Sequence, residues 1–145
     1  MHVTLKEITR DNFEQVIDLE LTEAQRSHLT PNVRSLVESH YHPETHYPRA
    51  IYVDDQIAGF ILWSIDLPDE VIIFRFMVDA KWQKKGIGRQ ALQVAIDEIS
   101  SHDGVDEILI CYSPENSIAK RVYLSMGFVE QGMDGDDMIA TLKVR

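Results

Sequence analysis

The chain has 145 residues, of which 44% are hydrophobic and 26% charged, proportions that suit a single globular domain over residues 1–145. Its formal charge of −10 argues against a nucleic-acid partner, because Lys and Arg side chains dominate phosphate binding. No apolar run reaches the roughly 20 residues of a membrane span, and the first residues lack a signal-peptide core, so a cytoplasmic protein without membrane contact is expected.

The negative charge is uneven along the chain. Residues 1–70 contain 5 Lys and Arg against 13 Asp and Glu, a net −8, whereas residues 71–145 contain 9 against 11, a net −2. An acidic surface serves solubility in general. It also attracts a polycationic substrate, and both interpretations stay open.

The chain is expected to begin with a strand and a helix. Residues His2–Glu7 alternate in polarity, which predicts the strand. Asp11 lies three residues before Glu14, the spacing of a capping box, so Asp11 is expected to cap the helix. The residues that follow helical periodicity are Phe13, Val16, Ile17, Leu19 and Glu20.

A second helical region is expected in two pieces, over residues 23–29 and 32–40. Thr22 and Pro31 are start signals for the two pieces. Leu36 and Val37 are expected to face inward.

The next stretch contains several side chains that could ligate a metal ion, namely His40, His42, Glu44 and His46. Their spacing is not diagnostic of a metal motif. Pro43 and Pro48 mark a loop, in which polar histidines are common. We therefore expect a loop and no metal.

A hairpin and a central strand follow. Residues 50–53 and 57–65 are predicted to pair around a turn at 54–56, with Gly59 marking a bulge or a closely packed position. A turn at 67–70 leads into Val71–Val78, whose β-branched and aromatic residues predict a strand buried on both faces. Arg75 is the one charge inside this strand.

The stretch Gln83–Arg89 joins this strand to a helical pattern that starts near Gly86. Two glycines let the backbone curl tightly, and the first N–H groups of a helix form a prepared site for phosphate oxygens. Four cations lie within nine residues: Lys81, Lys84, Lys85 and Arg89. A plain strand-to-helix connection with a solvated basic face is the alternative. The stretch fits neither a Walker loop nor a dinucleotide fingerprint.

The C-terminal third is expected to hold a strand, a helix and a hairpin. Gly104 is predicted to cap the preceding helix, and the strand over 107–112 places the lone cysteine, Cys111, as a small buried residue. Pro114 and Asn116 open the next helix. A hairpin of 128–131 and 138–144, turning through 132–137, completes an α/β domain around one mixed sheet.

Two sequence blocks resemble one known family. Gln83 to Gly88 matches the pattern Gln or Arg, two residues, Gly, one residue, Gly or Ala, and Asn116 to Phe128 matches N-x-x-A-x-x-x-Y-x-x-x-G-F. These are signatures of the GCN5-related N-acetyltransferases (GNAT), a resemblance that covers about residues 1–143. It implies a central, mixed, mostly antiparallel sheet flanked by helices. Arg75-Phe-Met, Trp82-Gln83 and the short hairpin are most similar to bacterial polyamine acetyltransferases.

The resemblance implies acetyl-coenzyme A as cosubstrate, no metal, and direct attack by an amine in a ternary complex. It implies that N–H groups of 84–89 hold the pyrophosphate, and that the backbone of Met77 and Val78 pairs with the pantetheine. Asn116 would bind the pantetheine arm and Tyr123 would protonate the departing thiolate. A helix cap and a core aromatic are the alternatives for these two residues. The expected cofactor-binding residues are Phe76, Met77, Val78, Gln83, Lys84, Lys85, Gly86, Ile87, Gly88, Arg89, Asn116 and Lys120.

The acceptor amine has to lose a proton, because an amine with a pKa near ~10 is almost wholly protonated at neutral pH. Glu70 is the preferred base because it precedes the central strand, with Asp66, Glu20 and Glu38 as alternatives. The expected partner is a small-molecule amine, and the resemblance favours a polyamine such as spermidine or spermine. A protein N-terminus, lysine, amino acid or aminoglycoside acceptor stays open, as do a non-catalytic acyl-coenzyme A module and a homodimer.

Overall fold

The computed structural model describes residues 1–26, 30–67 and 69–145. The helices are α1 (Phe13–Ile17), α2 (Glu23–Arg26), α3 (Asn32–Tyr41), η1 (Ala80–Trp82, a 3₁₀ turn), α4 (Ile87–Ser100) and α5 (Ser117–Ser125). The strands are β1 (Val3–Glu7), β2 (His46–Val53), β3 (Gln56–Ile65), β4 (Val71–Val78), β5 (Glu107–Tyr112), β6 (Val129–Asp134) and β7 (Asp137–Lys143). The last residues of the predicted 23–29 helix, and part of the 67–70 turn, lie outside the described residues.

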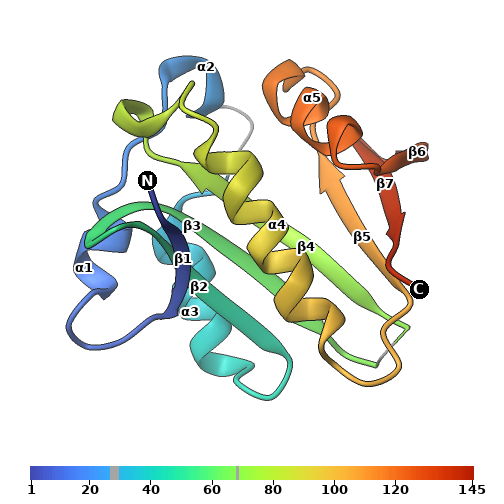
Figure 1. Cartoon of the computed structure of the whole chain (residues 1–145), viewed down its shortest axis with the longest axis horizontal. Coiled ribbons are helices and arrows are strands. Elements are labelled where there is room, and N and C mark those ends of the chain that lie inside the picture. Colours follow the sequence, from blue (N-terminus) through green and yellow to red (C-terminus); the bar gives the residue numbers. More distant parts are fainter. Residues whose placement is uncertain (27–29, 68) are drawn as a thin grey trace.

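The described strands form one seven-stranded sheet in the order β1-β2-β3-β4-β5-β7-β6. The β4–β5 pair is parallel and the other pairs are antiparallel, which confirms the mixed, mostly antiparallel sheet. Helix α4 crosses one face of the sheet, while α1 and α3 lie behind it (Figure 1). The crossover through α4 allows β4 and β5 to run parallel.

The core divides into two apolar clusters, one on each face of the sheet. Beneath α4, a buried stripe from Ile87 to Ile99 packs on Trp63 and its neighbours. The opposite cluster joins Phe60 and Met77 to α1 and α3. The apolar periodicity of α4 therefore predicts its buried face correctly.

Strands β4 and β5 part shortly after they meet. Their register pairs only Ile72 with Leu109 and Ile73 with Ile110. On the β3 side the register shifts after Ile73, so that Phe74 is the extra residue of a bulge. The remainder of β4 and the end of β5 therefore diverge, as Figure 1 shows, and open a gap in the sheet.

Several local expectations are wrong in detail. Helix α1 begins at Phe13 after Asn12, not after an Asp11 cap, and it ends before Leu19 and Glu20. The side-chain oxygen of Asn12 instead accepts a 2.7 Å hydrogen bond from the Thr9 N–H. A helix of five residues is stabilised by its packing on the sheet, so the packing of Val16 and not a capping pattern sets its ends.

Two further expectations fail for geometric reasons. On α3, Leu36 packs against the core but Val37 is 52% exposed, because the inward face of the helix follows Ser35 and Ser39 instead. Helix α4 ends at Ser100, so Gly104 lies in the following turn with φ +83° and does not cap the helix.

The strands around β3 extend further than expected. Strand β2 starts at His46, and Pro48 is accommodated because β1 pairs only as far as Arg49. Gly59 fulfils both predicted roles, since it adjoins a bulge and a Cβ there would collide with the Met77 carbonyl oxygen. The last hairpin turns within Gly135 and Asp136, more tightly than predicted.

Candidate active site

The connection between β4 and α4 is a tight, left-handed turn. Lys84 has φ +63° and Gly86 has φ +78°. Gly86 is the N-cap of α4 and no side chain caps the helix, so its first N–H groups face outward without intrahelical acceptors. Upstream, the Asp79 carboxylate accepts hydrogen bonds from the Lys81 and Glu20 N–H groups at 3.0 and 2.8 Å. These bonds hold the start of the connection, and the uncapped N–H groups of α4 are the donors at the positive end of this 14-residue helix.

The end of β4 offers a free backbone edge beside this turn. The Asp79 N–H donates to the Ala58 carbonyl oxygen at 2.7 Å, so Asp79 faces β3. Because backbone groups alternate along an antiparallel strand, those of Met77 also face β3, and those of Phe76 and Val78 face the gap. The Val78 carbonyl oxygen accepts a 2.8 Å hydrogen bond from Gln83 Nε2. The expectation that the Met77 backbone pairs with the pantetheine is therefore wrong in its direction, because those groups are turned to β3 and the groups of Phe76 face the gap instead.

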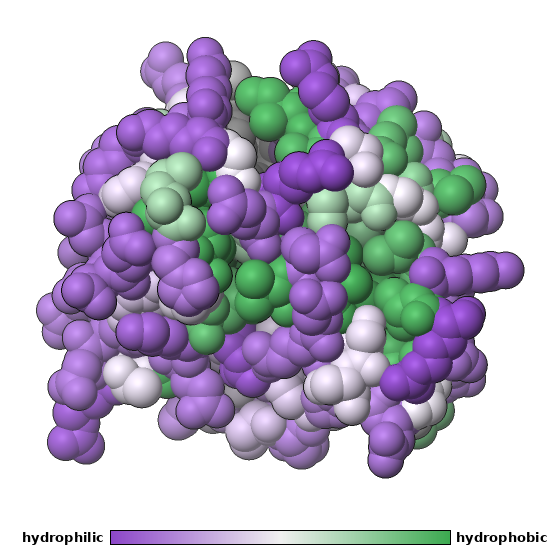
Figure 2. Space-filling view, viewed as in Figure 1, coloured by the Kyte–Doolittle hydropathy of each residue, from purple (hydrophilic) through white to green (hydrophobic). Residues whose placement is uncertain are grey.

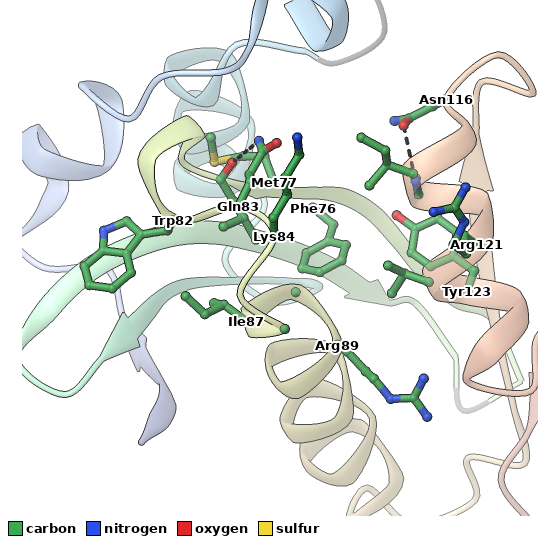
Figure 3. Close-up of a pocket in the computed structure, with 16 residues that line it drawn as sticks. Phe76, Met77, Trp82, Gln83, Lys84, Ile87, Arg89, Asn116, Arg121 and Tyr123 are labelled. Carbon is green, nitrogen blue, oxygen red and sulfur yellow. Dashed lines mark hydrogen bonds between the residues drawn. The ribbon is translucent and has the colours of Figure 1, made fainter. Parts of the chain in front are cut away.

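The turn, the free edge and α5 enclose a cavity of about 450 Å³. Its lining residues are Phe76, Met77, Val78, Trp82, Gln83, Lys84, Gly86, Ile87, Gly88, Arg89, Asn116, Ile118, Ala119, Arg121, Val122 and Tyr123. In Figure 3 the residues from β4 and the turn lie opposite those from α5. Figure 2 shows apolar side chains gathered in the central part of this face, within a hydrophilic rim.

Tyr123 closes the inner end of the cavity. It is 4% exposed, and its ring lies 5.2 Å from that of Tyr112 and about as near to Phe76 and Phe128, at 6.2 and 6.0 Å. Burial raises the pKa of the Tyr123 hydroxyl above its usual range, and Tyr112 adds to the effect. The hydroxyl is therefore protonated at neutral pH, and Figure 3 shows it directed toward Phe76.

Asn116 caps α5 and also lines the cavity. Its side-chain oxygen accepts a 3.2 Å hydrogen bond from the Ala119 N–H, so the helix-cap interpretation is confirmed. The residue is 8% exposed. The cap fixes the amide at the cavity wall, and its binding role stays a prediction.

A second cavity of about 290 Å³ lies where β4 and β5 part. Its lining residues are Thr30, Ile73, Phe74, Arg75, Phe76, Ile110, Cys111, Tyr112, Ser113, Asn116, Tyr123 and Asp137. Phe76, Asn116 and Tyr123 line both cavities. The gap in the sheet thus joins a basic, glycine-containing pocket to a smaller polar one.

A model of the acetyltransferase (GNAT) family matches residues 12–128, and these include the turn, the free strand edge and α5. The chain belongs to this family. It is an acetyl-coenzyme A-dependent N-acetyltransferase.

Relatives within the GNAT family differ in their acceptors. A spermine/spermidine N(1)-acetyltransferase of Bacillus subtilis (strain 168) is 25% identical over 142 residues, covering 91% of each chain. A [Ribosomal protein bS18]-alanine N-acetyltransferase of Salmonella typhimurium is 35% identical over 77 residues, covering 53% of this chain and 51% of the relative. The crystal structure of spermidine N-acetyltransferase from Vibrio cholerae, in complex with CoA and spermine, superposes with a TM-score of 0.78 at 18% identity over 97% and 95% of the chains, which shows the shared fold.

Not every predicted residue lies in the GNAT cavity. Lys85 Nζ lies 5.5 Å from the centre of the Trp82 ring, and Lys120 Nζ lies 3.6 Å from a Glu130 carboxylate oxygen. Neither lysine lines the cavity. Five further residues line the cavity without having been predicted to bind the cofactor, namely Trp82, Ile118, Ala119, Arg121 and Val122. Arg121 is one of two adjacent basic residues inside the second signature block, and the prediction chose the other, Lys120.

The candidate bases lie outside both of these cavities. Glu70 and Asp66 are exposed at the start of β4 and the end of β3. Glu38 is paired with Arg34 and Arg75, and Glu20 borders a separate hollow beside α2. Glu70 precedes Phe76 by six positions, roughly 20 Å along an extended strand.

The described residues include no group of three or more His, Cys, Asp or Glu side chains placed to hold a metal ion. His42 and His46 stack at 5.2 Å, and His46 contacts Phe74 as part of the sheet. Of the helices described, none has both the length and the apolar character to cross a membrane.

Proposed function

We propose that the protein transfers the acetyl group of acetyl-coenzyme A to a primary amine of a small polyamine, such as spermidine or spermine. The observation that carries this proposal is the meeting of two cavities at Phe76, Asn116 and Tyr123, where β4 and β5 part. Two cavities with a common wall allow both substrates to bind at once. Direct attack in a ternary complex is the mechanism that suits this arrangement.

The residues of the larger cavity fit coenzyme A. The uncapped N–H groups of Ile87, Gly88 and Arg89 suit the pyrophosphate oxygens, and Lys84 and Arg121 supply positive charge at the same cavity. The free edge of β4 can pair with the amide groups of the pantetheine as an added strand would. Bound acetyl-coenzyme A supplies the activated acetyl group as a thioester.

The remaining chemistry falls to the chain. The neutral amine nitrogen attacks the carbonyl carbon, a C–N bond forms, the C–S bond breaks, and its electron pair goes to sulfur. The amine loses one proton to solvent, and Tyr123 donates one to the sulfur and regains it from solvent. The products are an N-acetylamine and free coenzyme A. Glu70 could receive the amine proton only through intervening solvent, because it lies outside both cavities.

A polyamine acceptor has two kinds of support. A relative that matches nearly the whole chain, with 91% of each sequence covered, is a spermine/spermidine N(1)-acetyltransferase. Residues 1–70 carry a net charge of −8, which attracts a polycation. Asp137 adds a carboxylate to the lining of the smaller cavity.

A protein N-terminus is the second candidate acceptor. The Salmonella typhimurium bS18-alanine acetyltransferase has the higher identity, 35%, over about half of the chain. Release of free thiol from acetyl-coenzyme A, measured with spermidine, spermine, a monoamine and an alanine-terminated peptide, tests both acceptors. Turnover of the polyamines above the monoamine and the peptide supports the proposal. Preference for the peptide would replace it, and no turnover with any amine would refute it.

A further inference from the structure

Arg75 places a positive charge in the smaller cavity. The bulge at Phe74 directs the side chains of Phe74 and Arg75 to the same face of the sheet, toward α3. The Arg75 guanidinium donates a 2.8 Å hydrogen bond from Nη1 to the Phe74 carbonyl oxygen, and Nη2 lies 3.7 Å from a Glu38 carboxylate oxygen. Its Nε is buried without a hydrogen-bond partner in the described structure.

The guanidinium is only partly neutralised. Its side chain is 22% exposed, and burial is the main influence that lowers the pKa of Arg75, although an arginine stays charged at any ordinary pH. One carboxylate oxygen of Glu38 lies 3.7 Å from Arg75 Nη2, but the other lies closer, at 3.1 Å, to Nε of Arg34 on the same helix. Arg75 therefore keeps much of its positive field in the cavity.

The other titratable groups that line this cavity come from three elements. They are Cys111 and Tyr112 on β5, Tyr123 on α5 and Asp137 on β7. The Tyr112 hydroxyl donates a 2.7 Å hydrogen bond to a Glu130 carboxylate oxygen, and burial raises the pKa of both tyrosines. The charged side chains nearest the acceptor space are thus Arg75 with Glu38, Glu130 beside Tyr112, and Asp137 at the exposed rim.

We propose that Arg75, with its charge tempered by Glu38, favours the neutral and nucleophilic form of the acceptor amine in the smaller cavity. This inference rests on the proposed amine acetylation. A nearby like charge disfavours an ammonium ion, and lysines beside another cation are activated as nucleophiles in this way. Arg75 directly precedes Phe76, which lines both cavities, so its field acts next to the place of attack.

The effect answers a specific need of this site. An amine with a pKa near ~10.4 is neutral in roughly one molecule of 2,500 at pH 7. The smaller cavity has one carboxylate among its described lining residues, that of Asp137 at its exposed rim, and the preferred base, Glu70, lies away from both cavities. A shift of about one to three pKa units would raise the neutral fraction roughly tenfold to a thousandfold.

Because Arg75 and Glu38 carry opposite charges, their single variants should shift the pKa that governs kcat in opposite directions. Arg75→Met leaves Glu38 unopposed, so the pKa governing the rise of kcat with pH should increase. Because ammonium binding improves as well, KM and kcat at pH 7 should both fall. Glu38→Gln leaves Arg75 unopposed. The pKa governing the rise of kcat with pH should therefore decrease, and KM should rise. The double variant should return toward wild type, and Arg75→Lys should keep the wild-type profile.

The experiment measures kcat and KM for spermidine from pH 6 to 10 at saturating acetyl-coenzyme A, with thermal unfolding as a check on folding. Opposite shifts of the kcat pKa in the two single variants support the inference. If the ion pair served only to hold α3 against β4, both variants would change activity in the same direction, and parallel changes or unshifted profiles would overturn it. A wild-type protein that turns over no amine would refute the proposed function as well.

Discussion

The side-chain amide of Gln83 donates a 2.8 Å hydrogen bond to the carbonyl oxygen of Val78. This bond spans η1 and ties the first residue of the glycine-containing turn to the last residue of β4. Val78 belongs to the free strand edge, and Gln83 belongs to the basic turn. The bond therefore fixes two parts of the coenzyme A cavity relative to one another, which gives a physical reason for Gln at this position of the signature.

Gln83→Ala should weaken coenzyme A binding while the fold persists. A net hydrogen bond of this kind contributes about 0.5–1.5 kcal/mol, so the dissociation constant should rise about two- to tenfold. Titration calorimetry with coenzyme A measures the effect. Gln93→Ala is a matched control, because Gln93 donates a 3.0 Å hydrogen bond to Asp97 on the exposed side of α4. Equal affinities in the two variants would show that the Gln83 bond does not organise the cavity.

Replacement of Gly86 should be more damaging. Its φ of +78° is strained for any residue with a Cβ, and a branched side chain would occupy the space beside the uncapped end of α4 that the pyrophosphate is proposed to fill. We expect Gly86→Val to weaken coenzyme A binding more than tenfold. Gly135→Val is the control for backbone strain alone, because Gly135 also has a positive φ, +61°, but lies in open space at the hairpin tip. Matching losses of affinity in both variants would assign the effect to general destabilisation.

The sequence predicts the elements of this site well because their signals are local. A long amphipathic pattern fixes α4, and a run of β-branched and aromatic residues fixes β4. The glycine-containing turn lies between them by connectivity alone. These three parts supply most of the larger cavity.

The smaller cavity could not be predicted, because it depends on where two strands separate. The bulge at Phe74 has no glycine or proline to mark it, and it decides that Arg75 faces α3. Glu70, the predicted base, lies outside both cavities for a related reason. Proximity in sequence to β4 said nothing about which end of the strand borders the gap.

The acidic first half of the chain predicts a salt effect on the acceptor. Screening over about 8–10 Å at physiological ionic strength weakens a diffuse field. The KM for spermidine should therefore increase with sodium chloride more steeply than the KM for an uncharged aromatic amine, with acetyl-coenzyme A saturating. Initial rates from 20 to 500 mM salt provide the comparison. Parallel salt dependence would mean that the net −8 serves solubility and not substrate attraction.

Tyr123→Phe separates the chemical role of the hydroxyl from the packing role of the ring. The ring lies against Phe76, Tyr112 and Phe128, and phenylalanine preserves those contacts, so stability and coenzyme A affinity should change little. A thiol with a pKa near ~8.5 leaves tolerably unaided. Loss of the proton donor should therefore lower kcat by about tenfold to a thousandfold, around the low end of the ~10² to 10⁴ typical of general acids. Because burial raises the pKa of Tyr123, its loss of a proton should not limit kcat at or below pH 9. If Tyr123→Phe kept the wild-type kcat and lost only thermal stability, Tyr123 would be a core aromatic, and the proton would reach the sulfur from solvent.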